Sequence, residues 1–130
     1  MKQHTTNYAN SFIEVAEDCP AHQGQEPPVR QQPSVARVQF EMLVEDPYRY
    51  TSVDVIFEST GKRRGLSREE FFAKGQPCFR ASPLTKRYGW GVHCDEHGRI
   101  ALVAMESTEY RAFAADAELQ HVKAMRSSRG

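Results

Sequence analysis

The sequence has no long apolar run, no excess of charge and few cysteines, and each absence excludes a class of protein. No stretch approaches the ~18 apolar residues that a membrane-spanning helix needs. The 17 Lys and Arg residues balance 17 Asp and Glu residues. This balance argues against nucleic acid as a partner, since its binders carry a basic excess or a basic face. The polar start at residues 1–7 lacks the apolar core of a signal peptide, so we expect a cytoplasmic protein without a membrane partner.

Catalytic signatures are also absent. The sequence contains no serine nucleophile elbow, no His-Glu-x-x-His zinc motif, no Walker loop and no dinucleotide-binding glycine pattern, and we expect no cofactor. The three cysteines, Cys19, Cys78 and Cys94, are an odd number in a chain without an export signal, so reduced thiols are expected. Composition alone therefore leaves the function open.

The 130 residues fit a single domain, which we predict to span residues 1–130. Residues 21–33 hold three prolines, four glutamines and one glycine and almost nothing apolar. Such a stretch indicates an exposed loop. Too little chain precedes it to form a core, so it is not a domain boundary.

Periodicity and capping signals predict several elements. Alternation at residues 11–16 indicates a strand. Helices are predicted from Ser34 to about residue 46, over residues 67–74 with a stop at Gly75, and from Ser107 onwards, because each follows a serine in N-cap position. On the first helix we expect a buried face of Val35, Val38, Met42 and Leu43.

Residues 88–94 and 99–105 flank a short polar turn and predict a β-hairpin. Residues 51–57 fit a short helix or a strand, and the helix is favoured because a Thr cap precedes an acidic residue. Residues 78–81 are expected to be extended, and residues 118–130 remain unassigned. The sum is an α+β domain with a small antiparallel sheet and three or four helices packed against it.

Four motifs carry a resemblance to a known family: FIEVAEDCP at residues 12–20, PYRYTS at 47–52, GQPCFRASPL at 75–84 and KRYGWGVH at 86–93. With them the chain resembles a family of short bacterial proteins described only as a domain of unknown function. The match covers nearly the whole chain. The resemblance implies a single-domain bacterial protein and supplies no activity, ligand or catalytic residue.

The segment at residues 78–93 is dense in donors and aromatic rings. Arginine can hold a phosphate or carboxylate with two hydrogen bonds, and aromatic rings can stack on a base. In a strand, Gly89 and Gly91 would share the face of His93 and leave an open groove. We therefore predict a small anionic or nucleotide-like ligand at Arg80, Lys86, Arg87, Tyr88, Trp90 and His93. The alternative is that Trp90 is core, the glycines allow tight packing and the basic side chains face solvent.

Two cysteine–histidine combinations suggest other chemistry. Cys78 and His93 are candidates for a catalytic thiolate pair, with the charge of Arg80 beside them; the alternative is a buried, inert thiol. Two Cys-x-x-His pairs offer ligands that zinc prefers. Their members are Cys19 with His22, and Cys94 with His97. Neither pair has a common zinc-finger spacing, and the resemblance implies an aromatic residue at position 94 and no fixed histidine at position 22, so we expect no metal.

Three functions remain as hypotheses from the sequence. The first is binding of the small anionic ligand. The second is a protein-interaction or self-association module, including a homodimer, whose sheet edge or basic tail meets its partner. The third is an enzyme that depends on Cys78 and His93. Tyr48 and Tyr50 are expected only to pack the first helix against the next element.

Overall fold

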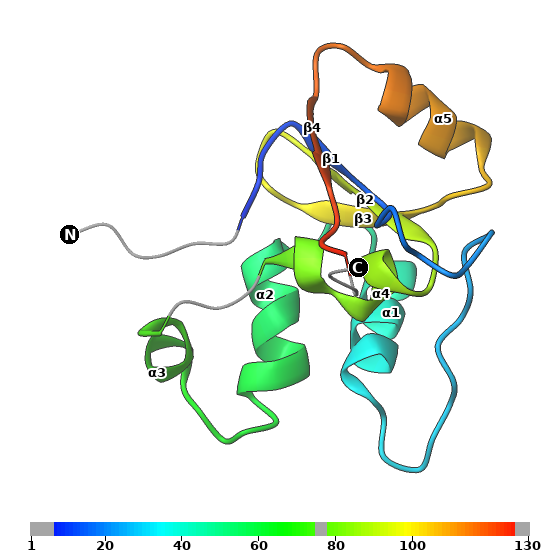
Figure 1. Ribbon diagram of the computed structural model, residues 1–130. Coiled ribbons are helices and arrows are strands. Elements are labelled where there is room, and N and C mark those ends of the chain that lie inside the picture. The colour runs from blue at the N-terminus through cyan, green and yellow to red at the C-terminus, as the bar shows by residue number, and fades with distance from the viewer. Residues whose placement is uncertain (1–6, 75–77, 127–130) are drawn as a thin grey trace.

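The computed structural model describes residues 7–74 and 78–126 and places a four-stranded sheet at its centre (Figure 1). The strands lie in the order β3-β2-β1-β4. Their bounds are β1 (Ser11–Glu14), β2 (Trp90–Cys94), β3 (Ile100–Ala104) and β4 (Gln120–Lys123). The hairpin of β2 and β3 and the early strand β1 confirm the sequence-based predictions.

The sheet is mixed. β1 pairs with β2, and β2 with β3, in antiparallel fashion, whereas β1 and β4 are parallel. The α+β class is confirmed, but the expectation of a wholly antiparallel sheet is wrong. The physical reason is the helix between β3 and β4: it returns the chain across one face of the sheet, so that β4 enters beside β1 in the same direction.

The two faces of the sheet are covered by different helices. Ile13, Val92 and Ile100 share one face and join the main core cluster. On this side lie α1 (Val35–Glu45), α2 (Ser52–Ile56) and α4 (Pro83–Lys86), while α5 (Thr108–Ala115) covers the opposite face (Figure 1). Phe12, on that opposite face, packs edge-on against Tyr110 of α5 at a centroid distance of 5.0 Å.

Serine and threonine caps begin the helices where the sequence predicts. The side chains of Ser34, Thr51, Ser67 and Ser107 each accept a hydrogen bond from the backbone N–H three residues later. These caps open α1, α2, α3 (Arg68–Phe72) and α5, so the helix at residues 51–57 is confirmed over the strand alternative. A π-helical turn, η1 (Phe57–Gly61), continues α2. The predicted stop at Gly75 lies outside the described residues.

Two local predictions differ from the structure. Of residues 78–81 only Cys78 has extended backbone angles: the other three form a 3-10 turn, η2 (Phe79–Ala81), and α4 follows at once, one helix more than expected. Thr85 Oγ1 donates to the carbonyl of Phe79 at 3.0 Å, which ties the two turns together. On α1, the buried residues are Ala36, Gln39 and Leu43, so the buried face includes a polar side chain that periodicity of apolar residues does not reveal.

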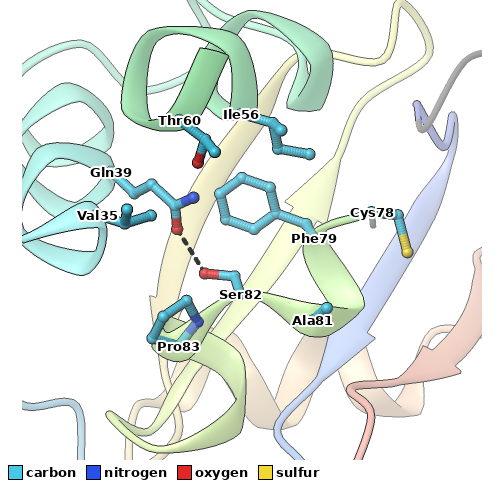
Figure 2. Close-up of a pocket in the computed structure, with 9 residues that line it drawn as sticks. All are labelled: Val35, Gln39, Ile56, Thr60, Cys78, Phe79, Ala81, Ser82 and Pro83. Carbon is cyan, nitrogen blue, oxygen red and sulfur yellow. Dashed lines mark hydrogen bonds between the residues drawn. The ribbon is translucent and has the colours of Figure 1, made fainter. Parts of the chain in front are cut away.

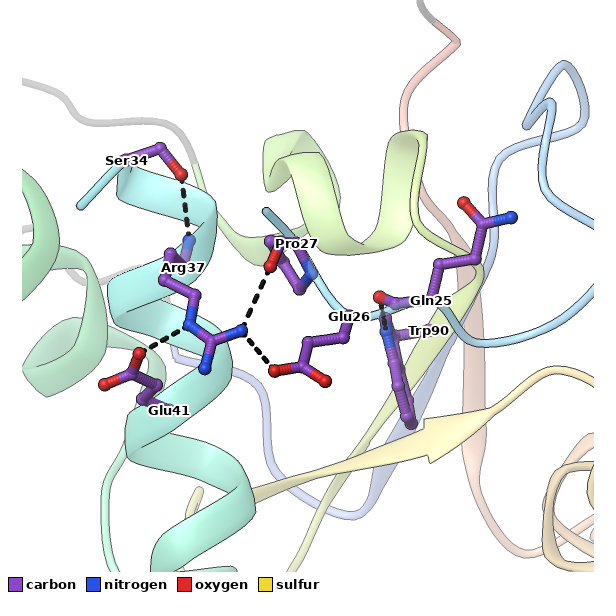
Figure 3. A network of polar contacts seen from close by, with 7 residues as sticks. All are labelled: Gln25, Glu26, Pro27, Ser34, Arg37, Glu41 and Trp90. Atoms are coloured by element: carbon purple, nitrogen blue, oxygen red, sulfur yellow. Dashed lines mark hydrogen bonds and ion pairs between the residues drawn. The ribbon is translucent and has the colours of Figure 1, made fainter. Parts of the chain in front are cut away.

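The loop at residues 21–33 is largely exposed, yet polar contacts fasten it to α1. The Arg37 guanidinium donates to the Glu26 carboxylate and, at 3.0 Å, to the Pro27 carbonyl (Figure 3). It also donates to Glu41 one turn along the helix. Pro27 is fully buried. The loop therefore follows a defined path on the side of the sheet that α1, α2 and α4 cover.

Replacing Gly91 with alanine is expected to destabilise the protein by about 1–3 kcal/mol, the usual cost of overpacking. A Cβ at this position would lie 2.7 Å from Tyr110 Cε2 and 2.9 Å from Phe12 Cζ. Urea unfolding measures the change in free energy. In a Tyr110→Ala background the same substitution should cost less, because one of the clashing groups is gone. An equal cost in both backgrounds would contradict the close approach of α5 to β2.

Candidate functional site

The residues predicted to form a ligand groove are distributed over both faces of the sheet. Trp90 and His93 point to opposite faces, because side chains alternate along β2. The space beside the two glycines is filled: α5 covers Gly91, and the Gln23 carbonyl would lie 2.4 Å from a Cβ at Gly89. The glycines therefore allow tight packing, which was the alternative interpretation.

Trp90 packs between the loop and α1. Its indole Nε1–H donates to the Gln25 carbonyl at 2.8 Å (Figure 3), and its ring lies 5.7 Å from that of Phe40. The basic candidates point elsewhere. Arg80 donates its Nε–H to the Lys123 carbonyl at 2.6 Å, Arg87 is exposed and Tyr88 packs against the core. Lys86 ends α4, half-buried. The structure thus gives these side chains separate surroundings.

The structure also gives Cys78 and His93, the candidates for a catalytic pair, different neighbours. The Cys78 sulfur lies 3.6 Å from the Tyr8 hydroxyl, whereas His93 contacts Tyr48 and Phe113 on the α5 face. Cys94 is buried in the core, and this burial raises the pKa of its thiol to about 12. Within residues 7–74 and 78–126, no three His, Cys, Asp or Glu side chains form a group that could hold a metal ion. Cys19 and His22 lie in or beside the loop, and His97 lies exposed in the hairpin turn.

A groove of about 450 Å³ lies between β3, α5 and the turn that follows α1. Two aromatic rings from distant parts of the chain, Tyr48 and Phe113, stand at its walls. His93 lies between them: its ring stacks on Phe113 at 4.2 Å and meets Tyr48 edge-on at 5.6 Å. The lining residues are Pro47, Tyr48, Ala101, Leu102, Val103, Ala104, Ser107, Glu109 and Phe113.

Tyr48 adopts a backbone conformation that is rare for a side chain of its size. Its φ is +61°, in the left-handed region, which costs a non-glycine residue on the order of 1 kcal/mol or more. Two hydrogen bonds hold it there. Its N–H donates to the Ile100 carbonyl at 2.9 Å, and its hydroxyl lies 2.9 Å from His93 Nδ1. Strain of this kind is often retained at binding sites.

The protonation states of the Tyr48–His93 pair follow from burial. Burial lowers the pKa of His93 below its ordinary 6.5, against the opposing effect of Asp95 and Asp116, so the imidazole is neutral at pH 7. Burial also raises the pKa of Tyr48. Both groups are neutral, so one proton joins them: the hydroxyl donates when the imidazole carries its proton on Nε2, and the imidazole donates when it carries its proton on Nδ1.

The outer edge of β3 is only partly paired. At one end, the Ile100 N–H donates to the Tyr50 carbonyl at 2.9 Å while its own carbonyl accepts from Tyr48. At the other end, the Ala104 carbonyl accepts from the N–H and hydroxyl of Ser107. Since backbone groups alternate between the two edges of a strand, Leu102 and Ala104 also point outward. In the described part of the chain the Leu102 N–H, the Leu102 carbonyl and the Ala104 N–H have no hydrogen-bond partner.

These observations define a small α+β domain with an aromatic groove beside an open sheet edge. The chain belongs to DUF6157, a family of unknown function, whose family model matches residues 3–130. No curated protein matches the chain, and no solved structure does. Of the helices in the described ranges, none has the length and apolar character needed to cross a membrane.

Sequence reasoning missed most of this groove. It identified His93 but paired it with the wrong neighbours, and it assigned Tyr48 only to packing. Phe113 was part of a predicted helix and carried no functional signal. The positive φ of Tyr48 has no marker in the sequence, because the residue type that favours that conformation is glycine.

The depressed pKa of His93 predicts that the protein loses stability as the pH falls below about 6.5. In this range the unfolded chain binds a proton that the folded imidazole resists, so protonation favours unfolding. Thermal unfolding between pH 7.5 and pH 5.5 should show a falling midpoint in the wild type. The fall should be smaller in His93→Phe, which keeps a ring against Phe113. His97→Gln, at an exposed histidine, is the matched control and should retain the wild-type slope. Equal slopes in all three proteins would show that the lowered pKa of His93 is not the cause of the loss of stability.

Proposed function

We propose that this protein is a peptide-binding module, in which an extended segment of a partner protein adds to the outer edge of β3 and fills the adjoining groove. The observation that carries the proposal is the set of backbone groups on Leu102 and Ala104 that have no partner among residues 7–74 and 78–126, placed at the wall of the groove. Strand addition of this kind obtains affinity from main-chain hydrogen bonds and specificity from pockets for alternate side chains.

The open edge accommodates a short segment. One peptide residue, in antiparallel register, can exchange both of its hydrogen bonds with Leu102, and the carbonyl of the residue two positions before it can accept from the Ala104 N–H. The edge is closed at one end by the pairing of Ile100 with Tyr48 and Tyr50. At its other end Ser107 occupies the Ala104 carbonyl. About three residues of the partner can therefore pair with β3.

The groove determines which side chains fit. The Leu102 side chain packs toward the main core, so the peptide residue opposite it points to the same side. The residues before and after it point to the α5 side, where Tyr48 and Phe113 form the walls. Of the described residues that line the groove, Glu109 alone is charged. The partner segment is therefore apolar with one basic residue.

This chemistry supports the interaction-module hypothesis over the other two. An acidic lining disfavours an anion, and the Arg80 guanidinium already donates to Lys123. Self-association through two copies of β3 would need the Ala104 carbonyl as an acceptor, yet two donors from Ser107 already reach it. A partner peptide needs only the three free groups.

The test begins with a displayed library of random peptides, selected against the full chain. A selected peptide is then titrated into the 15N-labelled protein. The expected result is slowed hydrogen exchange of the Leu102 and Ala104 amides, because both become donors to the peptide. N-methylation of the peptide residue that donates to the Leu102 carbonyl should weaken binding at least about tenfold. Protection confined to β4, or protection that grows with protein concentration without peptide, would overturn the proposal.

Two substitutions test the groove walls. Phe113→Ala removes one wall and should weaken peptide binding about tenfold or more, in the range seen for buried aromatic anchors. Tyr48→Gly removes the other wall and should also weaken binding, while the fold tolerates it because glycine adopts φ = +61° without strain. Val122→Ala, on the opposite sheet edge, is the control and should bind as the wild type does. Unchanged affinity in both groove variants would contradict the proposed site.

A further inference from the structure

A second cavity, partly open to solvent, lies on the other side of the sheet, bordered by α1, the end of α2, η1 and the η2–α4 segment (Figure 2). Its volume is about 180 Å³. It shares no lining residue with the groove at β3. The lining residues are Val35, Gln39, Ile56, Thr60, Cys78, Phe79, Ala81, Ser82 and Pro83.

The Gln39 carboxamide points into this cavity from α1 (Figure 2) and is 4 % exposed as a residue. Its Nε2 donates to Ser59 Oγ at 3.1 Å, and its Oε1 accepts from Ser82 Oγ at 2.6 Å. Both serines have fixed roles. The Ser59 hydroxyl donates to the Val55 carbonyl at 2.8 Å, and Ser82 Oγ accepts from the Leu84 N–H at 3.1 Å. The oxygen and nitrogen of the Gln39 amide are therefore assigned by their partners.

This network leaves Gln39 with unused hydrogen-bonding capacity. A primary amide offers two N–H donors and two acceptor lone pairs, and one of each is used. Within the described residues, Gln39 makes no further hydrogen bond. Both polar atoms of Gln39 are hydrogen-bonded, and each can make one bond more, so a ligand that supplies one acceptor and one donor would complement the amide.

The π-helical turn η1 places two of the groups around Gln39. Its i→i+5 bond runs from the Lys62 N–H to the Phe57 carbonyl at 2.9 Å. The wider turn carries Ser59, which anchors the amide, and Thr60, which lines the cavity. Single π-helical turns occur frequently at functional sites. This turn is defined by its backbone hydrogen bonds and not by the cavity that it borders.

Size and polarity restrict the ligand further. A cavity of 150 Å³ holds a benzene-sized molecule, so this one takes a single small ring. Val35, Ile56 and Phe79 supply apolar surface for the faces of a ring. All nine lining residues belong to the described part of the chain, and none of them carries an Asp, Glu, Lys or Arg side chain. The ligand is therefore neutral.

We propose that this cavity binds a small neutral single-ring compound with an amide edge, whose carbonyl and adjacent N–H pair with the Gln39 carboxamide while its ring packs against Phe79. Pyrimidine-type lactams and pyridones have this chemistry. This cavity is separate from the peptide groove, so the proposal of a ring-binding site and the proposal of a peptide-binding site can each be correct without the other.

The probe that tests the proposal is 2-pyridone, a single ring with adjacent carbonyl and N–H groups. Protein-observed NMR should show shifts of the Gln39 side-chain amide and of the Phe79 ring, with a Kd of about 1 mM or below, which is attainable for seven heavy atoms. N-methyl-2-pyridone carries a methyl group in place of the N–H donor and should bind about tenfold more weakly. Benzene should also bind more weakly. Equal binding of all three, or no binding of 2-pyridone up to ~10 mM, would overturn the proposal.

A variant separates the amide from the apolar walls. Gln39→Met keeps a side chain of similar length without the amide, and should abolish the preference for 2-pyridone over its N-methyl derivative. Gln32→Met, in the exposed loop, should retain the wild-type preference. Phe113→Ala in the other groove should leave 2-pyridone binding unchanged. If Gln39→Met fails to fold, the comparison of the two pyridones on the wild type decides alone, because it requires no variant.

Discussion

Burial of the central strand β1 on both faces is the constraint on which the rest of the structure depends. Phe12 and Ile13 are adjacent in sequence and fully buried, so they require apolar cover on opposite sides of the sheet. On the side of α1, α2 and α4, the main core supplies this apolar cover. On the other side, α5 is the only helix among the described residues, and its Tyr110 and Phe113 lie on Phe12. The position of this helix then determines the groove.

The close approach of α5 depends on the absence of a side chain at Gly91. Tyr110 occupies the space where a Cβ would stand, and its hydroxyl accepts from the Val15 N–H at 3.0 Å. With α5 held in this way, Phe113 stacks on His93 and forms one wall of the groove. The same packing that stabilises the sheet therefore leaves an open strip beside β3, because one helix of eight residues cannot cover the whole face.

Local signals in the sequence were sufficient where a short motif determines the geometry. The caps at Ser34, Thr51 and Ser67 predicted helices that the structure contains, since a capping side chain and the backbone it bonds are only three residues apart. The hairpin was likewise recognised from its turn. The strand β4 was missed, because its residues are mostly exposed and its pairing with β1 joins segments about a hundred residues apart in the chain.

The candidate sites show the same division. His93 was selected from the sequence, but its partners Tyr48 and Phe113 come from a turn and a helix that the sequence could not place beside it. Gln39 was passed over, since a polar residue on an amphipathic helix is ordinarily assigned to the solvent side. Its burial depends on Ser59 and Ser82, which reach it from two other elements.

The sequence by itself determined the α+β class, the starts of four helices and the hairpin, because these depend on side chains that act on their own neighbourhood in the chain. Only the tertiary structure decided the parallel pairing of β4, the strained backbone of Tyr48, the free edge of β3 and the buried amide of Gln39. Each of these arises where segments distant in sequence compete for the same space or the same hydrogen bonds, and that competition is settled only when the chain is packed.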